Sequence, residues 1–103
     1  MVKTVPRRSW LFVAGADAAA HADAAASEAD VLIQELEDFT PPLLRPKARS
    51  MAAPLYERWR KAGAVAAVRI NPFESDGRED LAAVMAGRPQ AVLMSKEIGR
   101  AHV

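Results

Sequence analysis

Three carboxylates stand close together at the end of one apolar segment of this 103-residue chain. The segment VLIQEL spans residues 31–36, contains Glu35, and is followed directly by Glu37 and Asp38. Oxygen ligands of this kind suit a divalent cation or the water molecules around it. The alternative role is structural, because a carboxylate just beyond a strand often caps the next helix or pairs with an arginine. For Glu35 taken alone, the structural role is the favoured interpretation.

A guanidinium stands at the corresponding place in a second apolar segment. Residues 65–70 read VAAVRI, so Arg69 comes near the end of the segment and Asn71 directly follows it. An arginine fork binds a carboxylate through two hydrogen bonds. Together with Glu37 and Asp38, Arg69 therefore predicts a site that combines a divalent cation with an anionic substrate.

For three further basic residues and one histidine, the sequence favours a position at the surface or at a helix start. Arg45, Lys47 and Arg49 follow a proline-rich loop, and we expect them on a solvated face or at a helix start, where they could also attract phosphates. His21 lies in an alanine-rich stretch without a second histidine at ligand spacing, so we expect it at the surface.

Short β-like segments alternate with longer helix-like ones. Aromatic and β-branched residues between turn signals predict four strands. These strands span residues 9–15, 31–36, 65–70 and 91–95. Helical propensity and apolar spacing predict three helices. These helices span residues 16–29, 47–62 and 78–86.

The connections also carry structural signals. Gly63 and Gly87 are natural ends for the second and third helices. Pro54 is expected to kink the second helix or to begin another one. Strands that are separated by helices imply parallel pairing with right-handed crossovers.

Alternation along residues 31–37 separates two faces of the predicted strand. One face holds Val31, Ile33, Glu35 and Glu37, and the other holds Leu32, Gln34 and Leu36. In the next strand, Arg69 and Asn71 share a face. All four predicted strands change from apolar to polar or open chemistry at their carboxyl ends, where parallel α/β folds build their active sites.

Composition narrows the class of protein. The chain has no cysteine and a formal net charge of +1, and it shows neither an apolar run of roughly 18 residues nor the apolar region of a signal peptide. We therefore expect no thiol nucleophile, no nucleic-acid or membrane partner, and a cytoplasmic location. The absence of a glycine-rich phosphate-binding motif argues against a nucleotide-binding function. An open doubly wound sheet and part of a (β/α)8 barrel remain as candidate folds.

Six segments resemble, in order and spacing, the HpcH/HpaI aldolase/citrate lyase family, and in particular its citrate lyase beta-chain members. The segments are RRSWLFVAG (7–15), ADVLIQELED (29–38), KAR (47–49), AVRINPF (67–73), EDLAAVMAG (79–87) and AVLMSK (91–96). The resemblance implies an α/β fold, the N-terminal portion of a (β/α)8 TIM barrel with about four β/α units. It also implies a Mg2+-dependent carbon–carbon lyase acting on citryl-CoA, malyl-CoA or related 2-oxo or hydroxy acids.

The same resemblance implies roles for single residues. Arg69 would bind the substrate carboxylate, and Glu37 and Asp38 would lie in the outer shell of the Mg2+ ion. The barrel mouth would further hold Glu35, Asn71 and Lys96. The direct metal ligands are expected on later strands, beyond the end of this sequence. Members of the family often form homo-oligomers, which we expect of the parent enzyme as well.

The last seven residues, EIGRAHV (97–103), leave the family pattern. They match an in-frame reading of a common sequencing adapter, so we expect residues 1–96 to be a partial barrel domain and residues 97–103 a non-native tail. Because a barrel of this class needs about 250 residues, we expect a truncated chain that is inactive on its own. The rival interpretations are a phosphoenolpyruvate-mutase-like or 2-oxo-acid aldolase barrel, and a non-catalytic short α/β binding domain.

Overall fold

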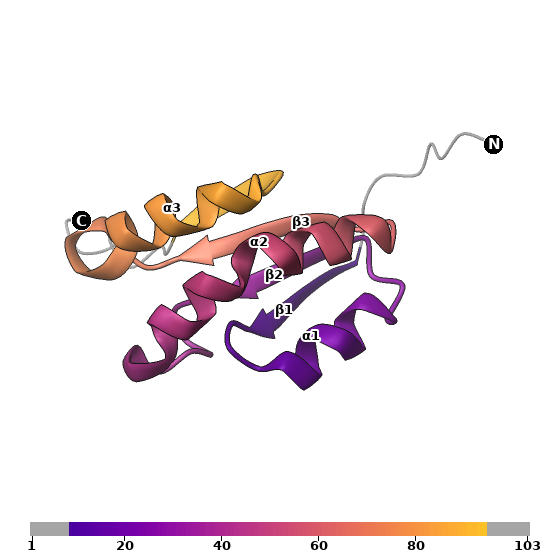
Figure 1. Cartoon of the computed structure of the whole chain (residues 1–103), viewed down its shortest axis with the longest axis horizontal. Coiled ribbons are helices and arrows are strands. Elements are labelled where there is room, and N and C mark those ends of the chain that lie inside the picture. Colours follow the sequence, from indigo (N-terminus) through magenta and orange to yellow (C-terminus); the bar gives the residue numbers. More distant parts are fainter. Residues whose placement is uncertain (1–8, 95–103) are drawn as a thin grey trace.

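Short segments rich in β-branched and aromatic residues form one parallel sheet in the computed structural model, which describes residues 9–94 (Figure 1). The strands are β1 (Trp10–Ala14), β2 (Val31–Glu35), β3 (Val65–Ile70) and β4 (Ala91–Met94). They lie in the order β1-β2-β3-β4, each parallel to the next, as predicted. The predicted strand end at Ser95, the candidate Lys96 and the tail at 97–103 lie outside the described residues.

Helices cover one face of this sheet (Figure 1). They are α1 (Ala18–Ala25), α2 (Arg45–Lys61) and α3 (Arg78–Val84). Short helical turns at Pro42–Leu44 (η1), Phe73–Gly77 (η2) and Met85–Gly87 (η3) flank α2 and α3. Parallel strands with helices outside them are the repeating unit of a (β/α)8 barrel. The described residues form such a unit without closing the barrel. No helix among them is long and apolar enough to cross a membrane.

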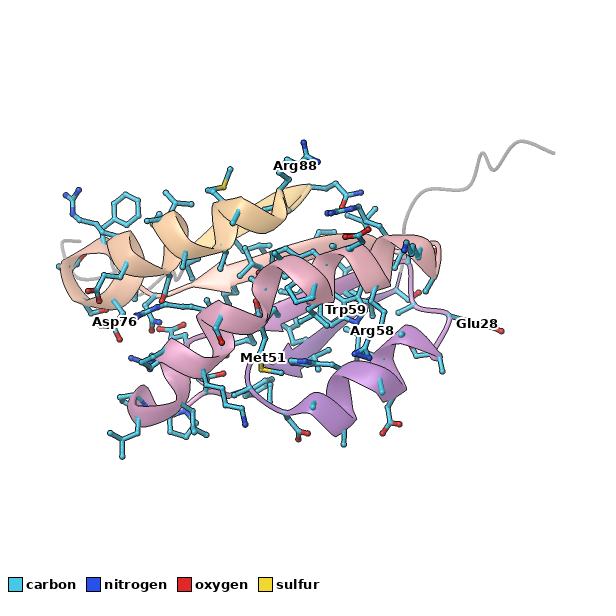
Figure 2. The ribbon with its side chains drawn as sticks, viewed as in Figure 1. Glu28, Met51, Arg58, Trp59, Asp76 and Arg88 are labelled. Carbon is cyan, nitrogen blue, oxygen red and sulfur yellow. The ribbon has the colours of Figure 1, made fainter. Side chains whose placement is uncertain are left out.

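The predicted alternation in β2 separates the two faces of the sheet. The face under the helices carries the main core, which includes Trp59 of α2 (Figure 2). Both Trp59 and Tyr56 are fully buried there. The opposite face carries a smaller cluster of Val31, Ile33 and Ala67, packed against Val65 and Leu93. This second face corresponds to the interior of a closed barrel, because barrel helices pack on the outside of the strands.

Helix α2 runs through Pro54 as a single helix of 17 residues, so the predicted start of a second helix at Pro54 is wrong. The apolar stripe explains this continuity. Ala52, Leu55 and Tyr56 are all buried on either side of the proline, and Pro54 itself is exposed. Packing of the stripe against the sheet outweighs the hydrogen bond that proline cannot donate. Beyond α2, Gly63 adopts a φ of +95° and ends the helix as predicted.

The predicted surface position of His21 is wrong. Its side chain is 1% exposed. The ring nitrogen Nε2 lies 2.9 Å from the backbone oxygen of Ala14, and the ring meets that of Trp59 edge to face. Because the neighbouring positions of α1 are mostly alanines, the imidazole fills the space between α1 and α2.

Candidate functional site

The carboxyl ends of β2 and β3 bring Glu35 and Arg69 side by side on the barrel-interior face. The two residues are register partners in the sheet, and Arg69 Nε lies 3.6 Å from Glu35 Oε2. Beyond the strand, Glu37 Oε1 lies 3.2 Å from Arg69 Nη2. The structure thus brings together Arg69, Glu35 and Glu37.

The carboxylate of Glu35 organises the loop that follows β2. Its Oε1 accepts hydrogen bonds from the backbone N–H groups of Glu37 (3.0 Å) and Phe39 (2.8 Å), and its Oε2 accepts one from Asp38 (3.2 Å). The side chain is fully buried. Glu35 therefore has a structural role, because its two carboxylate oxygens bind the backbone of the loop and contact Arg69.

Glu37 and Asp38 are the acidic side chains that remain open to a ligand. The Glu37 side chain is 12% exposed, and its Oε1 is a buried oxygen without a hydrogen-bond partner, because the contact with Arg69 lacks hydrogen-bond geometry. Asp38 is exposed. One carboxylate oxygen from each of Glu35, Glu37 and Asp38 can be chosen so that all three lie within 4.8 Å of one another. This is an oxygen-rich environment of the kind that suits Mg2+ and its bound water.

Neighbouring side chains hold Arg69 in place, but its guanidinium remains partly exposed. Its side chain is 28% exposed, and its guanidinium carbon lies 5.9 Å from the centre of the Phe12 ring, a cation–π contact. The two neighbouring glutamates orient the planar fork from one side. The guanidinium has five N–H donors in total, so donors remain for a carboxylate that arrives from the open side of the sheet.

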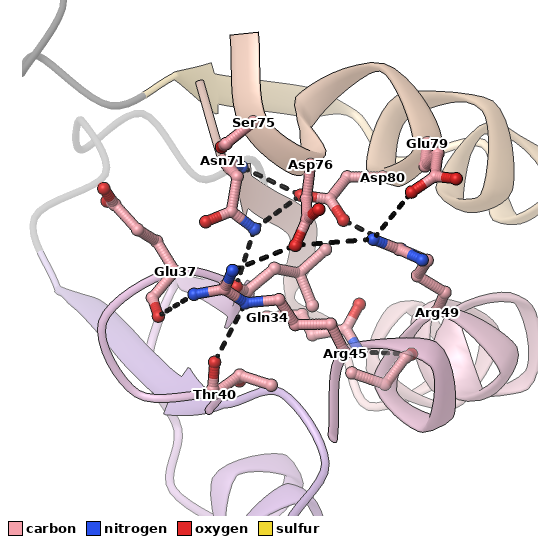
Figure 3. Close-up of polar contacts among 12 residues, drawn as sticks. Gln34, Glu37, Thr40, Arg45, Arg49, Asn71, Ser75, Asp76, Glu79 and Asp80 are labelled. Carbon is pink, nitrogen blue, oxygen red and sulfur yellow. Dashed lines mark hydrogen bonds and ion pairs between the residues drawn. The ribbon is translucent and has the colours of Figure 1, made fainter. Parts of the chain in front are cut away.

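A cluster of partly buried ion pairs supports the loops behind this site (Figure 3). Arg45 Nε and Nη2 donate to the backbone oxygens of Thr40 (3.1 Å) and Glu37 (3.2 Å), and Nη1 donates to Asp76 Oδ2 (2.9 Å). Arg49 Nε donates to Asp80 Oδ1 (2.9 Å). Of the two expected places, the helix start holds for Arg45, at which α2 begins, whereas the solvated face is wrong for both arginines, whose side chains are only 15% and 16% exposed. Their partners on the loop before α3 and on α3 itself draw them inward.

Asn71 points into this cluster. Its side chain is 2% exposed, and its Nδ2 donates to the backbone oxygen of Leu36 (2.9 Å) and to Asp80 Oδ2 (2.8 Å). Asn71 is expected at the barrel mouth, but its pairing with Asp80 is not among the expectations from the sequence. A signal was present, because Asp80 precedes the buried Val84 by four residues and so shares the buried face of a helix.

The end of β1 is tied to the same loop. The N–H of Gly15 donates to Thr40 Oγ1 (2.9 Å), which in turn donates to the backbone oxygen of Glu35 (2.6 Å). A Cβ at position 15 would lie only 2.7 Å from Thr40 Oγ1 and 2.8 Å from Glu35 O, so this approach requires glycine. A cavity of about 430 Å³ opens beside this junction, lined by Ala14, Asp17, Phe39 and Leu44 among others.

Comparison with known proteins assigns the chain to a family. The HpcH/HpaI aldolase/citrate lyase family model matches residues 8–96. The chain belongs to this family. Among curated proteins, none matches the chain significantly. Membership in an aldolase and lyase family supports a lyase-type function in general.

Proposed function

We propose that this chain contributes residues to the active site of a Mg2+-dependent carbon–carbon lyase, which cleaves a carboxylate-bearing substrate such as a citryl-CoA-like or malyl-CoA-like thioester or a related 2-oxo acid. One observation carries the proposal. The guanidinium of Arg69 lies at the carboxyl end of a parallel strand, on the barrel-interior face, beside the carboxylate of Glu37. Active sites of (β/α)8 barrels lie at this end of the strands.

Arg69 is proposed to bind and orient the substrate carboxylate. Glu35 and Glu37 fix the plane of the guanidinium, which reduces the freedom that a long side chain loses on binding. Both contacts are ion pairs at 3.2 Å or more and lack short hydrogen bonds, so a substrate carboxylate can compete for the donors. A bidentate contact would then hold the substrate in one orientation while its carbon–carbon bond breaks.

The acidic residues fit an outer-shell role toward Mg2+. Glu35 is committed to backbone N–H groups, so it cannot be a direct ligand without releasing the loop. Glu37 and Asp38 have acceptor oxygens near the site, and they can hold water molecules around a cation. When bound, the cation supplies positive charge that stabilises the negative charge developing on the substrate as the bond breaks.

The proposed partners follow from this chemistry. The ligand is a small carboxylate or an acyl-CoA, and the cavity beside Phe39 and Leu44 offers room next to the site for a larger substituent. The absence of cysteine and the interspersed charge fit a cytoplasmic enzyme without a nucleic-acid partner. We further propose that the enzyme is a homo-oligomer.

The decisive test is a titration of the full chain with oxaloacetate in the presence of Mg2+. Calorimetry and NMR are used to measure binding. Arg69→Ala should weaken binding by about 10- to 100-fold, because a charge-assisted contact is lost. Arg60→Ala is the matched control, since it removes one arginine from the outer surface, where Arg60 contacts the backbone of Arg88. Equal affinity of wild type and Arg69→Ala, or no binding by wild type, would overturn the proposal.

A further inference from the structure

Asp80 is a buried carboxylate whose partners are all donors. Its Oδ2 accepts hydrogen bonds from the backbone N–H of Asn71 (2.9 Å) and from Asn71 Nδ2 (2.8 Å), and its Oδ1 accepts one from Arg49 Nε (2.9 Å). The side chain is 0% exposed. Because every neighbour donates, an acceptor-only group is required at this position.

The partner of Asp80 connects the two strands that carry the candidate site. Asn71 stands two residues after Arg69, and its Nδ2 also donates to the backbone oxygen of Leu36, the residue directly before Glu37. The N–H of Leu36 donates in turn to the backbone oxygen of Arg69 (3.0 Å). The ends of β2 and β3 are thus joined on both sides of Leu36, and Asp80 fixes the outer of these links.

We propose that Asp80 is a positioning residue for the Arg69–Glu37 pair. It holds Asn71 in the one orientation that ties β2 to β3, and Arg49 balances its charge in the buried layer. The inference rests on the proposed function, because the pair that it positions is the proposed carboxylate site. Asp80 does not touch that site, so its effect passes through Asn71.

The geometry requires a side chain at position 80 that accepts hydrogen bonds with both of its terminal atoms. In an Asp80→Asn variant one oxygen becomes an NH2 group, which would face either Asn71 or Arg49, and both of these are donors. The variant keeps the shape of the side chain but leaves either both N–H donors of Asn71 or the Nε–H of Arg49 without an acceptor. With the NH2 group toward Asn71, the Asn71 side chain would be free to turn away from Leu36, and the separation between Arg69 and Glu37 would no longer be fixed.

Glu79 provides a matched control within the same cluster (Figure 3). Its carboxylate lies 3.7 Å from Arg49 Nη2, and its side chain is 74% exposed. Glu79→Gln therefore removes one negative charge and one ion pair with Arg49 from the same neighbourhood, and it leaves Arg45 and the link between the strands in place.

The test compares Asp80→Asn with Glu79→Gln in the full chain. The Asp80 variant should bind oxaloacetate about tenfold or more weakly, and the side-chain Nε–H resonance of Arg69 should shift and exchange faster with water. The Glu79 variant should leave both quantities near wild type. Asp80→Glu, which keeps two acceptor oxygens, should restore part of the affinity. Unchanged affinity and an unchanged Arg69 resonance in a folded Asp80→Asn variant would overturn the inference.

Two further outcomes are informative. If wild type does not bind oxaloacetate, the proposed function fails, whereas a shifted Arg69 resonance in Asp80→Asn alone still supports the positioning role. If Asp80→Asn does not fold, Asn71→Ser serves instead, because it removes the bond to Leu36 and leaves Asp80 paired with Arg49. An Arg69 resonance identical to that of wild type in Asn71→Ser would overturn the inference.

Discussion

The indole N–H of Trp59 donates to the backbone oxygen of His21 over 3.2 Å, and the two rings meet edge to face with their centres 5.9 Å apart. This contact joins α1 to α2 in the buried layer over the sheet. Burial lowers the pKa of His21 below its usual 6.5, although the backbone oxygen of Ala14 and the carboxylate of Asp17 favour the charged form. The imidazole is therefore neutral in the folded protein near neutral pH.

We expect the stability of the chain to fall as the pH drops below 6.5. The unfolded chain binds a proton at His21 more readily than the folded chain does, so the stabilisation is fully present above the unfolded pKa and is lost toward the lowered folded value. The slope from this residue cannot exceed about 1.4 kcal/mol per pH unit. Urea unfolding at several pH values measures it. His21→Gln is the control, and equal slopes for the variant and wild type would contradict the prediction.

Removing the hydroxyl of Tyr56 should destabilise the folded chain. It donates to Gln34 Oε1 in the buried layer, and burial raises the pKa of the phenol so that the donor proton stays in place. Tyr56→Phe leaves the Gln34 oxygen without a partner, which costs about 1–3 kcal/mol. Chemical denaturation gives the free energy of unfolding. Ser50→Ala is the comparison, because its hydroxyl contacts only an exposed backbone oxygen, that of Lys47. A loss no larger than that of Ser50→Ala would refute the assignment.

The sheet could be predicted from the sequence because its signals are local. The predicted bounds of β3 coincide with those observed, and the period-2 pattern of β2 correctly separates the helix-covered face from the other. The meeting of Glu35 and Arg69 also follows from the sequence, since parallel strands place corresponding carboxyl ends together. The sequence favours a structural role for Glu35, and its hydrogen bonds to the loop after β2 agree with that role.

Contacts between distant segments could not be predicted in this way. Arg45 and Arg49 look like solvent-exposed basic residues in the sequence, but they pair with Asp76 and Asp80 more than 30 positions away. His21 is buried because α1 and α2 meet around it, which no local pattern of alanines reveals. Long-range pairing of charges depends on the packing of helices, and periodicity within one helix does not specify the partner.

Replacing Pro54 should stabilise the chain. Pro54 lies inside α2, exposed and without an N–H to donate to the preceding turn. Pro54→Ala restores a donor and the best helix former, a gain of up to about 3 kcal/mol. The greater freedom of the unfolded chain offsets about 0.4–1 kcal/mol of this. Thermal unfolding should therefore shift to a higher midpoint. Ala53→Pro, one position earlier in the helix, should shift the midpoint down, and a lower midpoint for Pro54→Ala would contradict the prediction.

Glu35→Gln should loosen the loop that carries Glu37 without unfolding the sheet. The carboxylate accepts the N–H groups of Glu37, Asp38 and Phe39, and an amide NH2 in place of one oxygen would face a donor. An unmade buried hydrogen bond costs about 1–3 kcal/mol, so these three amides should exchange with solvent faster by about tenfold or more, while those of β3 stay protected. Glu37→Gln is the control, because the Glu37 side chain accepts none of these bonds. Unchanged protection in Glu35→Gln would show that the loop holds its shape without the carboxylate.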